Sequence, residues 1–157
     1  MTNKDNLYNN RNGVLNDREL TSIIEEASIN ADFFLEGNVD VKYQTPTVVL
    51  NKENLYIKGV SNPEFAIELY TPVIEKVRNW AIPADKKYTI SVILDDFNTS
   101  TSKCLLDIFK EIEYKYKHKE ESVIRWYYLQ DDEDMLEAGE DFEDVIRAPF
   151  RLIERED

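Results

Sequence analysis

The sequence predicts an α/β protein with a small mixed β-sheet of about four to five strands and helices packed on it. Strand-like and helix-like segments alternate along most of the chain, which favours a mainly parallel sheet because parallel strands need long crossover connections. Two neighbouring strand-like segments are separated by only four polar residues, which adds an antiparallel hairpin. The length of 157 residues indicates one domain with a small extension.

The N-terminal part is predicted to hold a tail and one helix before the sheet begins. Residues 1–15 are rich in asparagine and have no apolar period, so we expect a mobile tail. From Asn16, a candidate N-cap, apolar residues recur at helical spacing, namely Leu20, Ile23, Ile24 and Ala27. We assign residues 16–40 to an N-terminal helical extension and residues 41–157 to the main domain.

The strands are expected from β-rich and alternating runs. They are residues 45–50, 55–60, 88–94, 122–129 and 148–153, the last at an edge of the sheet. The first two form the hairpin around the polar turn at residues 51–54. A second turn, Pro-Ala-Asp at residues 83–85, leads into the third strand, in which apolar residues recur with a period of two.

Three helices are expected between these strands. Ser61 and Glu64 match a capping box, so a helix is predicted to start there and run to about Trp80 with a kink at Pro72. Its apolar face is predicted to comprise Phe65, Leu69, Val73, Val77 and Trp80. The clearest helical period follows the third strand, with Leu105, Ile108, Phe109, Ile112 and Tyr116. Residues 131–144 form the last helix, with Met135, Leu136 and Phe142 as its buried candidates.

Composition excludes several classes of function. The net charge is −13, and residues 131–144 hold nine acids and no base, so that segment alone contributes −9 to the net charge. This balance argues against binding to nucleic acid or to an anionic membrane surface. The apolar stretches are too short to span a bilayer, and the N-terminus lacks an apolar secretory region. A single cysteine, Cys104, excludes an internal disulfide and fits a reducing cytoplasm, where we expect the protein, with the thiol packed on its helix.

The segment LDDFNTSTSK, residues 94–103, is the most informative motif. Two carboxylates end the third strand, and four hydroxyl residues, Thr99 to Ser102, follow at the start of the next helix. The free N–H groups and the positive dipole end at a helix N-terminus favour an anion. A hydroxyl at this place either caps the helix or carries a phosphate, which the helix terminus stabilises.

Two other readings of the same residues stay open at this point. Asp95 and Asp96, with acids from residues 131–144, could serve a metal-dependent enzyme, because sites in α/β folds gather at strand ends. Alternatively, the hydroxyl cluster only caps its helix in a constitutive interaction protein. Only four glycines and one histidine are present, so neither a glycine-rich phosphate loop nor a zinc site is expected, and no cofactor is assigned.

Several stretches in order resemble the SiaC family of bacterial regulatory phosphoproteins. They are TPTVVL, YIKGVSNPE, the helix ending in Trp80, FNTSTSK followed by LLDIFKEIE, and RWYYLQDDEDMLEAGEDF with a final Pro149-Phe150 pair, from about residue 43 to the C-terminus. The resemblance implies a fold like that of STAS-type anti-sigma factor antagonists, so residues 41–157 become a SiaC-like regulatory domain. Thr101 stands where the family often has serine, and the acidic DEDMLEAGEDF is a variant form.

The resemblance also implies a function without catalysis. The family's phosphoacceptor falls on Thr99, which a partner-switching kinase phosphorylates and a PP2C-type phosphatase restores. In the family's characterised system the unphosphorylated form binds and activates a diguanylate cyclase. We therefore expect a cytoplasmic signalling adaptor of cyclic di-GMP and biofilm regulation that docks its effector through residues around the switch. These partner-binding residues are Asp96, Asn98, Ser100, Thr101, Ser102 and Lys103.

Overall fold

A computed structural model describes residues 14–81, 87–116 and 123–157. Within these residues the chain forms one seven-stranded mixed sheet with helices on both faces, which confirms the α/β class and exceeds the expected strand number. The strands are β1 (Leu15–Asn16), β2 (Phe33–Leu35), β3 (Thr47–Leu50), β4 (Asn54–Ser61), β5 (Thr89–Phe97), β6 (Val123–Leu129) and β7 (Phe150–Glu156). The helices are α2 (Asp17–Ser28), α3 (Ala66–Arg78), α4 (Thr99–Tyr116) and α5 (Glu133–Val145).

The strand order across the sheet is β1-β7-β6-β5-β4-β3-β2. Strands β4, β5, β6 and β7 run parallel, joined by α3, α4 and α5, as the alternating pattern predicts. The β3–β4 hairpin is antiparallel, as expected from its short polar turn, and β2 adds a further antiparallel strand. The predicted turn at residues 83–85 lies outside the described residues.

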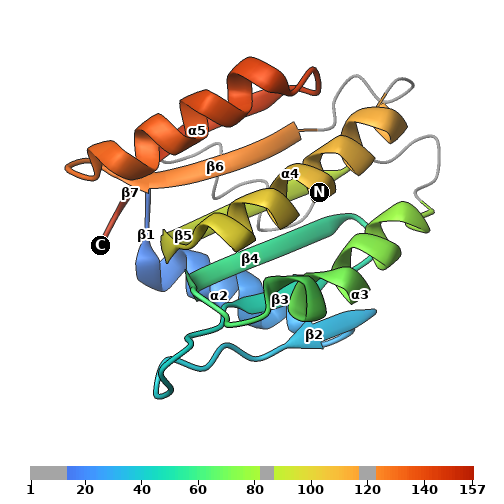
Figure 1. The fold of residues 1–157 in the computed structure, drawn as a ribbon, viewed down its shortest axis with the longest axis horizontal. Coiled ribbons are helices and arrows are strands. Elements are labelled where there is room, and N and C mark those ends of the chain that lie inside the picture. The colour runs from blue at the N-terminus through green and yellow to red at the C-terminus, as the bar shows by residue number, and fades with distance from the viewer. Residues whose placement is uncertain (1–13, 82–86, 117–122) are drawn as a thin grey trace.

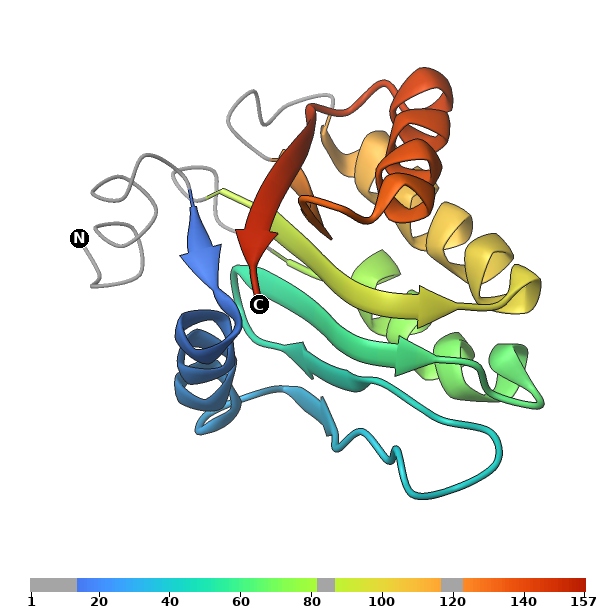
Figure 2. The same cartoon turned by 90° about the vertical axis from the view of Figure 1, so that its left-hand side faces the viewer.

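The helices form two unequal layers. Figures 1 and 2 show α3, α4 and α5 on one face of the sheet and α2 on the other. Alternate strand residues explain this division, since Val48 and Ile57 belong to the core under the three helices while Val49 and Tyr56 contact the α2 side. The buried side chains of α2 are Leu20, Ile23, Ile24 and Ala27, and the Asn16 side chain accepts a hydrogen bond from the Glu19 N–H, as an N-cap should.

The start of α3 differs from its prediction. Ser61 belongs to β4 and is fully buried, so it is not a helix cap, and the helix begins only at Ala66. Phe65 is 61% exposed, whereas Tyr70 is buried and takes the inward position. The capping-box pattern failed because the Ser61 hydroxyl is used in a contact between distant segments.

The two ends of the chain pair with each other. β1 lies parallel to β7, so β7 is not the edge strand that was expected, and Leu15 is buried rather than part of a tail. Residues 1–13 of the predicted tail lie outside the described residues. The division into an extension at residues 16–40 and a domain at residues 41–157 stays a prediction, although α2 packs on the same sheet as the rest.

β5 continues past its two carboxylates, which contradicts the expected strand end at Leu94. The pairing with β4 passes from Gly59–Leu94 to Val60–Asp96, so Asp95 is the extra residue of a β-bulge. Gly59, beside the bulge, has a φ of 113°, a conformation that glycine adopts without strain. The bulge therefore redirects the end of β5 immediately before α4 begins.

Candidate functional site

The candidate site lies where β5 passes into α4, and an asparagine closes this junction. The Thr101 N–H donates to Asn98 Oδ1 at 2.8 Å, which is the geometry of a helix N-cap. The Asn98 amide also donates to the Pro63 carbonyl at 3.0 Å, and its backbone N–H donates to the Ser61 carbonyl at 3.1 Å. Helix capping is thus performed by Asn98, and no hydroxyl is needed for it.

The four hydroxyl residues at the start of α4 lie in different environments. Thr99 and Ser100 are exposed, and neither side chain forms a hydrogen bond to any residue that the structure describes. Ser102 is half-buried, and Lys103 is exposed one turn after Thr99. Thr99 therefore offers a free hydroxyl at the first residue of the helix.

Thr101 does not lie at the surface, which corrects its predicted role as a partner contact. Its side chain is fully buried and donates to the Ser61 carbonyl at 3.0 Å. Its hydroxyl also lies 2.8 Å from that of Ser61, which in turn lies 2.7 Å from the Tyr70 hydroxyl. Burial is the main reason that the pKa of Tyr70 is raised, so the phenol stays a neutral partner.

This buried network ties the start of α4 to β4 and α3. Sequence reasoning missed Ser61 and Tyr70, because Ser61 fits a cap motif and Tyr70 stands outside the expected apolar face. Together with Asn98, the network fixes the backbone that carries Thr99. Cys104 is buried on the same helix, as predicted, and burial raises the pKa of its thiol, with Asp107 as a smaller cause.

The two carboxylates before the helix have separate partners. Asp95 accepts a hydrogen bond at 2.6 Å from Arg155, whose side chain is only 2% exposed. Asp96 accepts a hydrogen bond at 3.0 Å from the Asn62 side chain and is exposed. Across the described part of the chain, no three His, Cys, Asp or Glu side chains gather so that they could hold a metal ion.

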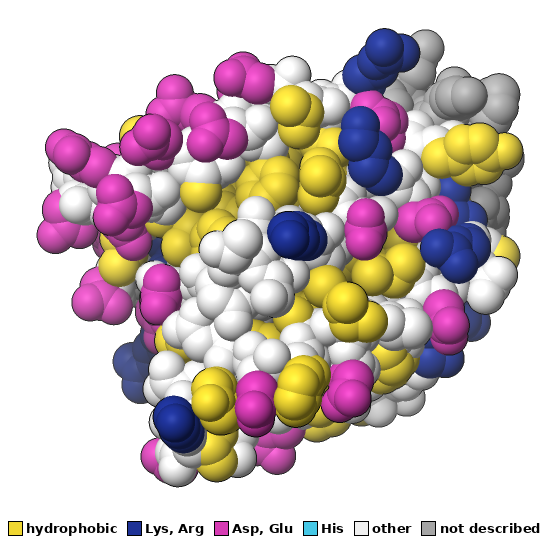
Figure 3. Space-filling model, in the orientation of Figure 1, with side chains coloured by type: hydrophobic (Ala, Val, Ile, Leu, Met, Phe, Trp, Pro, Cys, Tyr) yellow, Lys and Arg dark blue, Asp and Glu magenta, His cyan; other side chains and the backbone are white. Residues whose placement is uncertain are grey.

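The acidic segment forms α5 beside the site. Asp132 caps this helix by accepting a hydrogen bond from the Met135 N–H, and Met135 and Phe142 are buried as predicted, whereas Leu136 is only partly so. Figure 3 shows the acidic side chains over α5, with an apolar area between α5 and α4. Partly buried apolar side chains on this side of the sheet include Phe97 and Leu106, which come from the elements that meet at Asn98.

None of the helices within residues 14–81, 87–116 and 123–157 combines the length and the apolar character needed to cross a bilayer.

Comparison with known proteins identifies the family. The family model described as SiaC family regulatory phosphoprotein matches residues 39–155. An uncharacterised protein of Pseudomonas aeruginosa (strain UCBPP-PA14) is 28% identical over 98 residues, covering 62% of this chain and 78% of its own length. The fold is similar to that in a crystal structure of the diguanylate cyclase SiaD in complex with its activator SiaC from P. aeruginosa, with a TM-score of 0.68, 25% identity and coverage of 79% of this chain and 99% of that chain.

Two further solved structures support the same fold. SiaC of P. aeruginosa has a TM-score of 0.62 at 22% identity, and apo-SiaC from that organism has a TM-score of 0.61 at 24% identity, each covering 76% of this chain and 99% of the other. The chain belongs to the SiaC family of regulatory phosphoproteins. Because this is a family of regulatory proteins, the expectation of a regulator rather than an enzyme is confirmed. The alternative of a metal-dependent enzyme does not agree with this family.

Proposed function

We propose that this protein is a signalling adaptor whose partner binding is switched by reversible phosphorylation of Thr99. A partner kinase adds the phosphate, and a PP2C-type phosphatase removes it. The unphosphorylated form binds an effector, for which a diguanylate cyclase is the leading candidate. The observation that carries the proposal is the free, exposed hydroxyl of Thr99 on a helix start that Asn98 already caps.

The surroundings of Thr99 suit a phosphate. A phosphothreonine carries about −1.5 to −2 charges at neutral pH, and the N-terminal end of α4 stabilises such an anion. Lys103 lies four residues further along the helix, a spacing at which side chains meet on one helix face. A phosphate on Thr99 therefore has a hydrogen-bond donor on its own helix, and the site stays folded when the phosphate is added.

The same phosphate changes the docking surface. The proposed surface consists of Asp96, Asn98, Ser100, Ser102 and Lys103 with the exposed face of α4, and Thr99 lies among them. A new dianion beside Asp96 adds like charge and a strongly hydrated group, both of which oppose burial against a partner. Binding in the unphosphorylated state and release on phosphorylation follow without catalysis by this chain.

The effector is proposed from a relative. SiaC of P. aeruginosa forms a complex with the diguanylate cyclase SiaD as its activator. Our chain covers nearly the whole of that SiaC fold, so a cyclase partner and a cytoplasmic location are proposed here too. Because α5 is acidic, the partner of this chain can have a surface that differs from that of SiaD.

The test compares two exposed threonines on different helices. Thr99→Asp should weaken binding to the diguanylate cyclase of the same cell at least tenfold in calorimetry, while Thr99→Ala should bind like the wild type. Thr71→Asp is the matched control, since Thr71 is an exposed threonine on α3 outside the proposed docking surface, and it should leave binding unchanged.

Equal weakening by Thr99→Asp and Thr71→Asp would show general charge repulsion instead of a switch at Thr99. Tight binding by Thr99→Asp would argue for a constitutive interaction module.

A further inference from the structure

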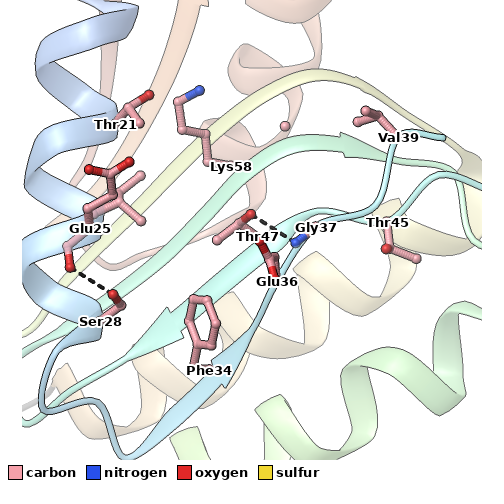
Figure 4. A pocket seen from close by; sticks show the side chains of 12 residues that line it. Thr21, Glu25, Ser28, Phe34, Glu36, Gly37, Val39, Thr45, Thr47 and Lys58 are labelled. Carbon is pink, nitrogen blue, oxygen red and sulfur yellow. Dashed lines mark hydrogen bonds between the residues drawn. The ribbon is translucent and has the colours of Figure 1, made fainter.

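A hollow of about 310 Å³ lies on the α2 face of the sheet, opposite to the face that carries Thr99. Figure 4 shows its walls: α2 on one side, the strand and loop after Phe34 on the other, and β3 and β4 beneath. Ile24, Phe34 and Val39 supply its apolar lining. Its volume is at the small end of the range for ligand pockets, which suits one side chain rather than a cofactor.

The charges around the hollow are unbalanced. Glu25 on α2 and Glu36 after β2 line opposite walls, and neither carboxylate is paired with any residue that the structure describes. Lys58 is the lining cation, but its ammonium group is held by Asp17 at 2.7 Å. The hollow therefore presents two free acids and no free base among its described lining residues.

Two large apolar side chains that line the hollow are exposed to solvent. Phe34 is 51% exposed and Val39 is 57% exposed. Exposed apolar side chains with charged side chains around them are typical of protein contact surfaces.

We propose that this hollow binds a lysine or arginine side chain that is flanked by apolar residues on a segment of another protein. The aliphatic stem of such a side chain packs along Ile24 and Val39, and its cation reaches Glu25 and Glu36. Phe34 offers its ring face to the same cation. The apolar neighbours of the basic residue cover the exposed parts of Phe34 and Val39.

This contact is separate from the switch. The family match begins at residue 39, so α2 and β2, which form two walls of the hollow, lie outside it. Thr99 is the first residue of α4, and Figure 2 shows this helix on the other face of the sheet from α2. Binding at the hollow is therefore independent of phosphorylation at Thr99 and adds a second partner contact to the adaptor.

The test uses the full chain and a short synthetic probe. In a titration followed by nuclear magnetic resonance, the peptide acetyl-Gly-Leu-Arg-Val-Gly-amide should shift the backbone amides of Thr21, Gly37, Thr47 and Gly59 in a saturable way. The same peptide with citrulline in place of arginine keeps the shape without the charge and should bind at least ~5-fold more weakly. The variant with Glu25→Gln and Glu36→Gln should lose about 3- to 20-fold in affinity.

Two controls separate this site from general attraction to an acidic protein. The variant with Glu137→Gln and Glu140→Gln removes two exposed charges from α5 and should bind the peptide unchanged, and so should Thr99→Asp. Shifts centred on α5, or equal binding of the citrulline peptide, would overturn the proposal. Agmatine that binds as tightly as the peptide would also overturn it, because the ligand would then be a small amine and not a protein segment.

Discussion

Removing the Asn98 side chain should destabilise the protein, whereas removing the neighbouring Thr99 hydroxyl should not. Asn98→Ala loses the cap bond to the Thr101 N–H at 2.8 Å, which is worth about 1 kcal/mol. It also loses the 3.0 Å bond to the Pro63 carbonyl, worth about a further 1 kcal/mol. The expected loss is thus about 2 kcal/mol, or roughly 4–8 °C in Tm for a domain of this size.

The assay is urea unfolding followed by far-ultraviolet circular dichroism, with both variants measured beside the wild type. Thr99→Ala is the matched control, and its free energy of unfolding should stay within about 0.5 kcal/mol of the wild type because its hydroxyl is free. A loss in Thr99→Ala as large as that in Asn98→Ala would refute the reasoning. In that case the Thr99 hydroxyl would be structural, and the argument for a free switch residue would fail.

Three further variants test the packing around the site. Thr101→Val removes a buried hydroxyl and leaves Ser61 without one partner, so urea unfolding should show a loss of about 1–3 kcal/mol; an unchanged midpoint would contradict the buried network. Gly139→Ala places a Cβ 2.5 Å from Cδ1 of Trp126, which should cost about 1–3 kcal/mol and change the tryptophan fluorescence, and a neutral substitution would contradict the close packing of α5. Because burial raises the pKa of Tyr70 above its ordinary value of 10, its contribution to stability is complete below pH 10 and falls as pH rises further. Tyr70→Phe should remove that part of the alkaline loss in denaturant titrations from about pH 8 to about pH 11, and an unchanged slope would contradict it.

The sequence was most informative where one local pattern decides the structure. The β3–β4 hairpin followed from its short polar turn, and α4 followed from Leu105, Ile108, Phe109 and Ile112, all of which are buried. No local sequence pattern predicted the two short strands that pair with distant segments of the chain. β1 has two residues and β2 has three, and each is a strand only because a distant partner lies beside it.

The sequence predicted where the candidate site lies, but it did not predict which role each of its residues has. The motif placed Thr99 at the start of a helix, as the structure shows. Asn98 was not predicted to be the cap, although its bond to the Thr101 N–H is local. The motif could not show that Thr101 turns inward, because that depends on Ser61 and Tyr70, which are distant in sequence. A run of hydroxyls looks uniform in sequence, and only the packing separates the free ones from the buried one.

The central claim, phosphorylation at Thr99, is tested most directly by the intact mass of the protein isolated from its own cells, with peptide mapping across residues 96–103. The account predicts a single phosphate on Thr99 that a PP2C-type phosphatase removes. A phosphate on Ser100 instead, or a protein that stays unmodified after incubation with the kinase of its own pathway, would contradict it.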